Sequence, residues 1–411
     1  MDDLLYLVHR IPWPPNKGDK IRSHHILRYL TQHYRVHLGT FVDDPDDLVH
    51  TAEVEGLCAS TCIRPLDSRR ARLRALGGLA TGAPLTLPWY RDRGLQRWVD
   101  DTIERHSISR ALIFSSAMSQ YLERHPGVVQ VTDFVDVDSD KWTQYAATRP
   151  WPLSAIYRRE GRRLLAYERR QAARSSASLF VSPDEAEAFR ERAPESAERI
   201  HAMNNGVDHA HFAPDRVPAH NPYPPYSRVM VFSGAMDYWP NVDVVVWFAR
   251  EVFPEIRVQE PHALFYIVGS RPAPAVTELG RLPGVMVTGF VEDMRAWIGH
   301  ADLAVAPLRI ARGVQNKVLE AMALARPVVA SPQALEGLSA QREQEVIEAP
   351  AEPAAFARAV LRGLAEGPSE RGERARKRVE TDYDWARNLA RLDGYLQGPV
   401  ASTAAPSMET T

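Results

Sequence analysis

Cysteine is scarce in this 411-residue sequence, and long apolar runs are missing from it. The two cysteines, Cys58 and Cys62, have three residues between them and no second pair, which argues against a zinc site and favours the reducing cytoplasm. No stretch approaches the roughly 18 apolar residues that a membrane span needs. The opening MDDLLYLVHR is acidic and then briefly apolar, so we expect a strand there and no signal peptide. The net charge of −2 provides no overall field that would attract nucleic acid.

The length, with 45% hydrophobic and 25% charged residues, points to two globular domains of similar size. Short apolar runs alternate with helical segments, and glycine recurs where the runs end. This alternation predicts an α/β fold of two Rossmann-like domains, whose parallel sheets face each other across a cleft. We expect an N-terminal domain over 1–205, a proline-rich linker over 206–226, a second domain over 227–385 and a disordered tail over 399–411.

The segment 303–330 is predicted to form a strand, a loop, a helix and a second strand. Gly313 lies in the loop, Lys317 lies near the helix start, and Glu320 follows one turn later. The free N–H groups and dipole of the helix start, together with the charge of Lys317, suit a phosphate or diphosphate. Glu320 could accept hydrogen bonds from two sugar hydroxyls. The alternative is a solvated pair of charges on a surface helix.

Two further strand–glycine–helix units are predicted, one near the start of each domain. The first has Gly18 at a tight turn and Asp19 as a helix cap. The second has Gly234, where backbone can approach a ligand, and Asn241 at the helix entry. Both units suit an anion, and a plain turn is the alternative for the first.

The phrase KVLEAMA, followed by an apolar strand, resembles the signature of glycosyltransferase family four, the retaining GT-B enzymes. The usual motif of this family has two glutamates separated by seven residues. Glu320 matches the second glutamate, and Arg312 stands where the first is expected. A subset of the family has a basic residue and a lysine before the second glutamate. Lys317 matches that lysine, and Gln315 stands where the arginine is expected.

Other phrases, namely FSGAMDYWPN, GFVEDM and GVQNKVLEAMA, look most like the sugar transferases associated with bacterial exosortase (PEP-CTERM) exopolysaccharide systems. The resemblance implies transfer of a sugar from a nucleotide diphosphate sugar to a lipid-linked saccharide, with retention and without a metal or other cofactor. It also implies a helix over 386–398 that crosses back to the N-terminal domain, and a position at the inner face of the cytoplasmic membrane.

The residue patterns and the resemblance together give three groups of candidate site residues. The predicted catalytic residues are Lys317, Glu320, Arg312, Asp133 and Asp136. The predicted donor-binding residues are Gly234, Asn241, Phe290, Val291, Arg309, Gly313, Val314, Lys317 and Glu320. The predicted acceptor-side residues are Gly18, Asp19 and Arg22.

The acidic segment TDFVDVDSDKW allows several functions. Asp136 and Asp138 form an Asp-x-Asp pair, which in GT-A transferases chelates a divalent ion. The GT-B organisation argues against that function here. We expect Asp133 and Asp136 to orient an acceptor hydroxyl or a loop, or to cap the next helix. A second acidic turn, over 43–47, is predicted to be solvated.

Two basic segments, over 69–74 and 157–174, are predicted to be solvated helices or contacts with anionic lipid. Two other functions stay open for the whole chain. One is a nucleotide-sugar 2-epimerase of the same fold. The other is a non-catalytic scaffold that binds saccharide or a partner enzyme, which the missing glutamate at position 312 would favour.

Overall fold

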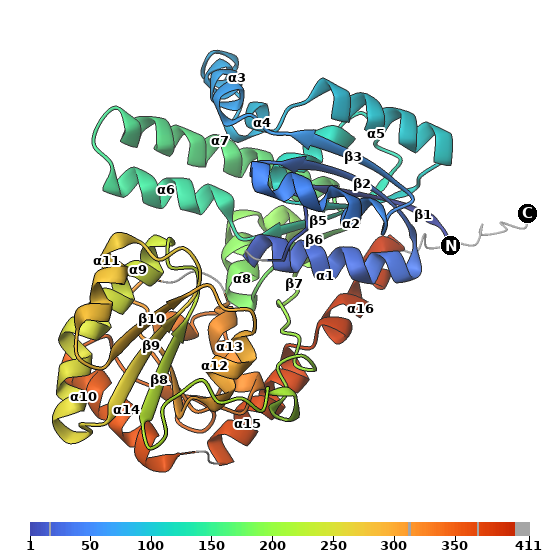
Figure 1. Ribbon diagram of the computed structural model, residues 1–411. Helices are drawn as coiled ribbons and strands as arrows, with labels where there is room; N and C mark the ends of the chain where they lie inside the picture. The colour runs from blue at the N-terminus through green and yellow to red at the C-terminus, as the bar shows by residue number, and fades with distance from the viewer. Residues whose placement is uncertain (16–17, 311–313, 368–369, 399–411) are drawn as a thin grey trace, which may run out of the picture. The chain divides into compact units, whose positions relative to one another are not determined.

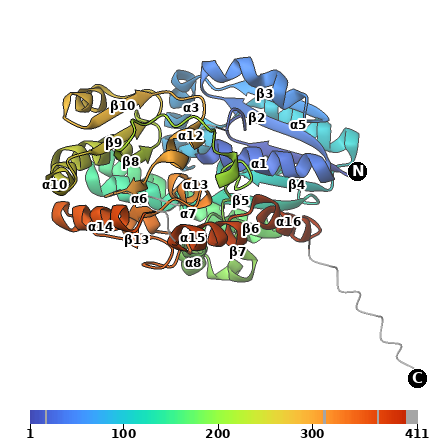
Figure 2. The same cartoon turned by 60° about the horizontal axis from the view of Figure 1, so that its bottom comes forward.

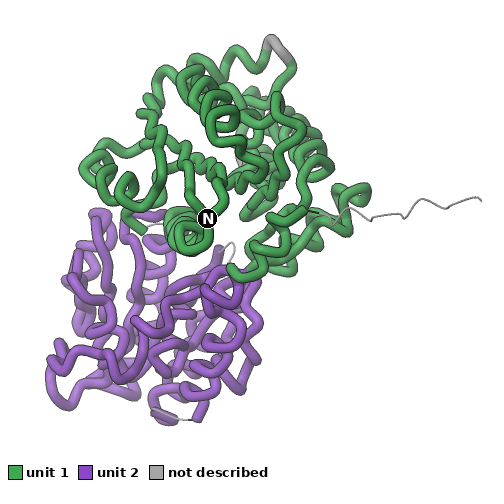
Figure 3. The backbone as a smooth tube through the Cα atoms, turned by 90° about the vertical axis from the view of Figure 1, so that its right-hand side faces the viewer, with its two compact units in different colours: residues 1–203, 389–411 green, residues 204–388 purple. Residues whose placement is uncertain are grey.

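The computed structural model describes residues 1–15, 18–310, 314–367 and 370–398 (Figure 1). The chain divides into two compact units (Figure 3). Unit 1 comprises Met1–Met203 and the chain from Leu389 onward, and unit 2 comprises Asn204–Asn388. Among the described residues, no helix combines the length and the apolarity needed to cross a membrane.

The described residues of unit 1 form a seven-stranded sheet in the order β3-β2-β1-β4-β5-β6-β7. All neighbouring strands are parallel. The order reverses direction between β1 and β4, and ligands of such sheets bind beside this point at the carboxyl ends of the strands. The strands are β1 (Asp3–Val8), β2 (Arg35–Val42), β3 (Ser60–Pro65), β4 (Arg110–Phe114), β5 (Val129–Val135), β6 (Ala177–Phe180) and β7 (Ile200–Ala202).

Helices cover both faces of the unit 1 sheet (Figures 1 and 2). On one face, Leu5 and Leu7 of β1 pack in an apolar core with residues of α5. On the other face, the Tyr6 hydroxyl donates to the Ser23 carbonyl of α1 at 3.2 Å. The alternation of β1 side chains therefore fixes α5 and α1 on opposite faces. The helices are α1 (Gly18–His33), α2 (Thr51–Glu55), α3 (Ser68–Thr81), α4 (Thr86–Trp89), α5 (Arg93–His106), α6 (Asp138–Thr148), α7 (Leu153–Arg174) and α8 (Pro183–Arg192).

The described residues of unit 2 form a six-stranded parallel sheet in the order β10-β9-β8-β11-β12-β13. The order reverses between β8 and β11, so unit 2 repeats the winding of unit 1. Its strands are β8 (Arg228–Ser233), β9 (Ala263–Val268), β10 (Val285–Gly289), β11 (Leu303–Ala306), β12 (Val328–Ala330) and β13 (Ile347–Glu348).

The helices of unit 2 also lie on two faces, with α10 and α14 on one and α12 and α13 on the other (Figure 1). The helix whose entry was expected at Asn241 begins two residues earlier, at Trp239, and continues through a π-helical turn, Phe248–Val252, into α10. The wider π turn accommodates Pro254, which lacks the N–H that a regular helix would use. The helices are α9 (Trp239–Trp247), α10 (Phe253–Gln259), α11 (Pro274–Thr277), α12 (Met294–His300), α13 (Asn316–Ala323), α14 (Pro353–Glu366) and α15 (Glu370–Asp382). The last helix, α16 (Trp385–Leu396), begins in unit 2 and ends in unit 1.

The predicted linker, 206–226, is packed against unit 2. Val207 and Tyr223 are buried in the core of that unit, and a Cβ on Gly206 would lie 2.6 Å from the Trp385 ring. Apolar burial thus makes this segment part of unit 2, which the proline content did not indicate. The chain passes back into unit 1 within α16, between Asn388 and Leu389. The tail predicted to be disordered, 399–411, lies outside the described residues.

Candidate functional site

Two glycines bring the ends of β8 and β9 into contact in unit 2. A Cβ on Gly269 would lie 1.7 Å from the carbonyl oxygen of Gly234. A Cβ on Gly234 would lie 2.8 Å from Asn241 Nδ2 and 3.3 Å from Lys317 Nζ. Both glycines have positive φ values, 152° at Gly234 and 155° at Gly269, which other residues rarely adopt. Glycine at these positions therefore leaves space for Asn241 and Lys317 at the strand end.

Lys317, the second residue of α13, places its ammonium group beside the end of β8. Its Nζ donates to Asn241 Oδ1 at 2.6 Å and lies 4.2 Å from the centroid of the Phe232 ring. Asn241 Nδ2 donates to the Ala235 carbonyl at 2.9 Å, which turns the amide oxygen toward the lysine. The structure thus brings three predicted residues, Gly234, Asn241 and Lys317, together where the strand order of unit 2 reverses.

Burial shifts the ionisation of Lys317 and Glu320, which both lie on α13. It lowers the pKa of Lys317 to about 7, although the charge of Glu320 opposes the shift. It raises the pKa of Glu320 to about 7, although the charge of Lys317 opposes that shift. Both side chains are half-buried, so the alternative of a freely solvated pair is wrong. An anion bound beside Lys317 would restore the charged form of the lysine and gain an ion pair with it.

Arg309, predicted to bind the donor, already has a carboxylate partner. Its Nη2 donates to Asp243 Oδ1 at 2.6 Å, and its guanidinium lies 5.9 Å from the centroid of the Trp247 ring. These contacts direct the cation toward α9. The two nearby predicted residues, Arg312 and Gly313, lie outside the described residues.

The remaining predicted donor-binding residues are apolar and differ in exposure. Phe290, directly after β10, is 75% exposed. Val291 and Val314 are half-buried against the core of unit 2. An exposed ring such as Phe290 can stack on a planar group of a ligand, whereas the two valines mainly fix their loops.

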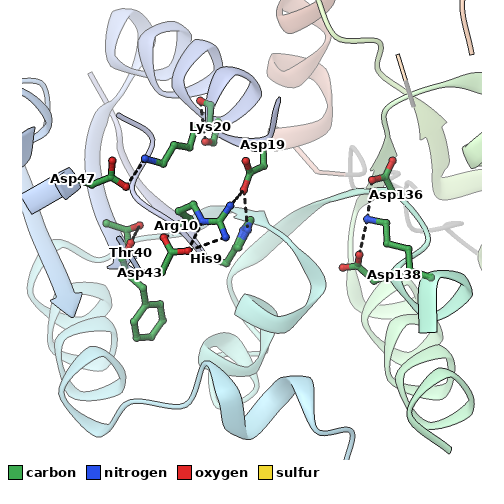
Figure 4. Close-up of polar contacts among 12 residues, drawn as sticks. His9, Arg10, Asp19, Lys20, Thr40, Asp43, Asp47, Asp136 and Asp138 are labelled. Atoms are coloured by element: carbon green, nitrogen blue, oxygen red, sulfur yellow. Dashed lines mark hydrogen bonds and ion pairs between the residues drawn. The ribbon is translucent and has the colours of Figure 1, made fainter. Parts of the chain in front are cut away.

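Four polar side chains meet at the carboxyl ends of β1 and β2 in unit 1 (Figure 4). Arg10 pairs with Asp19 at 2.6 Å and with Asp43 at 2.8 Å, and His9 Nε2 lies 3.4 Å from Asp19 Oδ2. The His9 ring stacks on Phe114 at the end of β4, with centroids 5.7 Å apart. Burial would raise the pKa of Asp19, but His9 and Arg10 outweigh it and hold that pKa well below its ordinary value.

Of this cluster, sequence analysis proposed only Asp19 as a site residue, and it placed Asp43 in a solvated turn. His9, Arg10 and Asp43 could have been found, because they directly follow the apolar runs that became β1 and β2. Gly18 does not make the predicted tight turn. It is the exposed first residue of α1, and a Cβ there would meet no atom within 4 Å.

Arg22 and Asp133 form an ion pair in the interior of unit 1. Both side chains are 0% exposed, Arg22 Nε lies 2.7 Å from Asp133 Oδ2, and Arg22 Nη1 donates to the Met203 carbonyl at 2.8 Å. Burial raises the pKa of Asp133, although Arg22 favours its charged form. Neither side chain offers surface to an acceptor. The structure therefore disagrees with the predicted acceptor-side role of Arg22 and the predicted catalytic role of Asp133.

The Asp-x-Asp pair binds a lysine. Lys141 Nζ lies 2.8 Å from Asp136 Oδ2 and 3.0 Å from Asp138 Oδ1 (Figure 4). Burial lowers the pKa of Lys141, but the two carboxylates outweigh it and raise that pKa above its ordinary value. The ammonium group supplies the positive charge that a divalent ion would otherwise bring. Asp136 does not cap α6, whose N-cap has no side-chain hydrogen bond.

The acidic turn over 43–47 is only partly solvated: Asp46 is exposed, as predicted, but Asp43 and Asp47 have cationic partners. Asp43 is paired with Arg10, and Asp47 is 5% exposed. Lys20, which is 1% exposed, donates to Asp47 Oδ2 at 2.5 Å. Both acids therefore hold cations from the β1–α1 region in place (Figure 4).

The two predicted basic segments differ in their packing. The segment 157–174 lies in α7, whose Glu160 accepts hydrogen bonds from the backbone N–H groups of Leu85 and Thr86 at 2.6 and 3.0 Å. It is therefore integrated into unit 1 rather than solvated all round. In α3, by contrast, Leu73 and Leu76 are 71% and 58% exposed.

Residues 227–366 match the family described as "Glycosyl transferases group 1". No sequence among the curated proteins matches the chain. The solved structures that share its fold include the following three. Sucrose-phosphate synthase from Thermosynechococcus elongatus is 17% identical with a TM-score of 0.69, over 97% of this chain and 98% of that one. A glycosyltransferase from Rickettsia africae is 13% identical with a TM-score of 0.69, over 96% and 98%. HepE from Anabaena, in complex with UDP, is 15% identical with a TM-score of 0.65, over 97% and 100%.

The fold is therefore GT-B, as predicted, with two α/β domains on parallel sheets. The residues that match the glycosyl transferases group 1 family all lie in unit 2, and the cluster of Gly234, Asn241 and Lys317 lies among them. Because the sequence identities are below 20%, these neighbours show only the fold of this chain. The substrates in their names are properties of those proteins.

Proposed function

We propose that the protein is a glycosyltransferase that moves a sugar from a nucleotide diphosphate sugar to a saccharide acceptor. The observation that carries this proposal is the position of Lys317, a cation at a helix start and 2.6 Å from Asn241, at the reversal point of the group 1 domain. A diphosphate is the ligand that such a cation and free N–H groups suit best. Because HepE has this fold and was solved with UDP, UDP is the first nucleotide to test.

In the proposed mechanism, Lys317 stabilises the diphosphate as it leaves the sugar. Charge develops on the leaving oxygen, and a preplaced ammonium group with backbone N–H donors lowers the energy of that state. Glu320 accepts hydrogen bonds from the ribose hydroxyls. We propose retention at the anomeric carbon, with the leaving phosphate accepting the proton of the acceptor hydroxyl. The positive charge of Lys317 makes a divalent ion unnecessary.

We place acceptor binding at the cluster of His9, Arg10, Asp19 and Asp43 in unit 1. These side chains lie beside the reversal point of their sheet, the position at which ligands of such sheets bind. Their carboxylates and ring nitrogen offer donors and acceptors suited to sugar hydroxyls. The buried pair of Arg22 and Asp133 would support this cluster from the interior and would not contact the acceptor.

We further propose a lipid-linked acceptor of exopolysaccharide synthesis, presented at an anionic membrane surface. α3 supports this step, because Leu73, Leu76 and Leu79 recur every three residues and are 71%, 58% and 40% exposed. Arginines of the same helix could contact lipid headgroups. Sedimentation with phosphatidylglycerol vesicles tests this step. L73D/L76D should abolish binding to the vesicles, and binding that survives the double substitution would contradict it.

Calorimetry with UDP and GDP tests the donor site. Lys317→Ala should weaken nucleotide affinity or donor turnover at least tenfold, equivalent to about 1.4 kcal/mol. Lys377→Ala is the matched control, since Lys377 is an exposed lysine of the same unit, on α15. Unchanged nucleotide affinity and turnover in a folded Lys317→Ala protein would remove Lys317 from the site.

Nucleotide affinity and donor turnover also distinguish a transferase from the two other functions, the non-catalytic scaffold and the 2-epimerase. A scaffold would bind no nucleotide. A 2-epimerase would convert the nucleotide sugar in the absence of any acceptor, whereas a transferase would show at most slow hydrolysis. A panel of nucleotide sugars, compared by thermal stabilisation, would then identify the donor.

A further inference from the structure

Three potential metal ligands meet at the amino edge of the unit 1 sheet. Asp3 is the first residue of β1, His37 lies near the start of the adjacent β2, and His106 is the last residue of α5. One ligand atom from each lies within 4.8 Å of the other two. The strands begin here, so this edge is opposite to the one that carries His9 and Asp43.

The hydrogen bonds of His37 hold its ring in a ligating orientation. Its Nε2 lies 2.8 Å from Asp3 Oδ1, and its Nδ1 lies 2.8 Å from Ser60 Oγ. Without a metal, Nε2–H donates to the Asp3 carboxylate; a bound cation would take the place of that proton, with Nδ1–H then donating to Ser60 Oγ. A metal-bound histidine typically has such a partner on its second nitrogen. The His106 ring lies beside that of His37, with centroids 4.4 Å apart.

The local charges also suit a cation. A neutral imidazole and an ionised carboxylate are the states that bind a metal. His106 lies at the carboxyl end of α5, where the helix dipole favours positive charge. Arg35 is the competing cation. Its Nε lies 3.6 Å from Asp3 Oδ1, and its side chain is 54% exposed.

We propose that Asp3, His37 and His106 bind a divalent first-row transition metal, with Zn²⁺ as the preferred ion. Two imidazoles and one carboxylate form a ligand set that suits Zn²⁺ better than Ca²⁺ or Mg²⁺, which prefer oxygen ligands alone. His37 is 1% exposed, whereas Asp3 and His106 are half-buried, so an ion can reach the site from solvent.

The site would be structural rather than catalytic. A bound ion would join the first residues of the chain to β2 and α5, which are distant in sequence. It would stabilise the folded state, and the stabilisation would grow with the logarithm of the ratio of free ion concentration to the dissociation constant. It would not take part in sugar transfer, because it lies at the opposite edge of the sheet from the proposed acceptor cluster.

The test uses the full-length, tag-free protein after removal of metals with a chelator. Zn²⁺ calorimetry and Co²⁺ absorbance should show one ion per chain, and Zn²⁺ should raise the Tm. Asp3→Asn and His106→Gln should each weaken Zn²⁺ binding at least tenfold, whereas Arg35→Gln should retain or tighten it. Asp3 and His106 are half-buried, and circular dichroism will check that their variants fold.

His125→Gln is the matched control. His125 Nε2 lies 2.7 Å from Asp100 Oδ1 in the same unit, a histidine–aspartate pair outside the three-ligand group. The proposal is overturned if the wild-type protein binds no Zn²⁺, if Asp3→Asn and His106→Gln bind it as the wild type does, or if the control loses binding equally. Loss of binding in Cys58→Ser/Cys62→Ser, with binding retained in Asp3→Asn, would assign the ion to the cysteines and would equally overturn it.

Discussion

At the scale of single residues, the environment of Lys317 makes nucleotide binding pH-dependent. The pKa of Lys317 is about 7 in the free protein because burial disfavours its charge, and a bound diphosphate raises that pKa. Below pH 7 the lysine is already charged, so the affinity for UDP should be nearly constant. Above pH 7 the charged fraction falls about tenfold per pH unit, so the affinity should fall by up to that factor. Ionisation of Glu320 over the same range favours the charged lysine and reduces this slope.

Calorimetry of UDP binding at pH 6.5, 8 and 9 measures this dependence. Lys317→Arg is the control, because arginine stays charged throughout this range, and its affinity should vary little. Equal affinities of the wild-type protein at all three pH values would contradict the predicted proton uptake.

Glu168 on α7 should lower the stability of unit 1 as the pH rises. It is 0% exposed, and neither carboxyl oxygen has a hydrogen-bond partner among the described residues. Burial, reinforced by Asp138, raises its pKa to about 8. The folded protein therefore keeps a proton that the unfolded chain releases near pH 4.5. Stability is greatest below that value and falls until about pH 8.

Glu168→Gln removes this ionisation, so its Tm should exceed the wild-type Tm by more at pH 8 than at pH 5. Glu160→Gln is the contrasting variant. The Glu160 carboxylate accepts hydrogen bonds from two backbone N–H groups, and its substitution should lower the Tm. If the Tm of Glu168→Gln differed from the wild-type Tm by the same amount at pH 5 and pH 8, Glu168 would already be ionised in the folded state.

At the scale of elements, sequence analysis predicted the strand–glycine–helix units well. The apolar runs at β1, β8 and β11 and the helix with Lys317 lie where they were expected, because burial on both faces produces a strong local pattern. β3 and β7 were not predicted. β3 is only half-buried and contains no continuous apolar run, and β7 has three residues, so both depend on pairing with neighbours in the sheet.

The packing of α6 on α7 depends on the absence of a side chain at Gly161. A Cβ there would lie 2.6 Å from Thr143 Oγ1 and 3.0 Å from the Ser139 carbonyl oxygen. Gly161→Ala should therefore lower the free energy of unfolding by about 1–3 kcal/mol. Gly394→Ala, the same change at an exposed position of α16 with nothing within 4 Å, should raise it by about 0.4–1 kcal/mol. Thermal and urea unfolding measure both, and a stabilising Gly161→Ala would show that α6 moves freely.

At the scale of the whole molecule, the two-domain GT-B organisation could be predicted, but the partners of its charged residues could not. Arg22 and Asp133 are 111 positions apart, and only the fold brings them together. Sequence reasoning treated both as site residues because buried and functional charges look alike in a sequence. Asp136 was also treated as a site residue. Its partner Lys141 lies only five positions away, and Lys141 forms an ion pair with Asp138 as well.

The return of α16 to unit 1 predicts which unit a substitution there will destabilise. Leu392 is 0% exposed, and the Tyr29 hydroxyl donates to Asp393 Oδ2 at 2.8 Å. Leu392→Ala should lower the stability of unit 1 by about 2–5 kcal/mol. In calorimetric unfolding, the transition that UDP stabilises should stay in place while the other moves to lower temperature. Ala390→Ser, on the exposed side of the same helix, should change neither. A shift of only the UDP-stabilised transition would assign Leu392 to unit 2.

Because unit 1 uses residues from before and after unit 2, the order of synthesis differs from the order of completion. All residues of unit 2 are synthesised before Leu392 and Leu396 are made. Unit 1, which is translated first, must therefore wait, with the surface that these leucines cover still open, until the whole of unit 2 has been translated. A premature stop near residue 388 would thus harm the early half of the protein more than the late one.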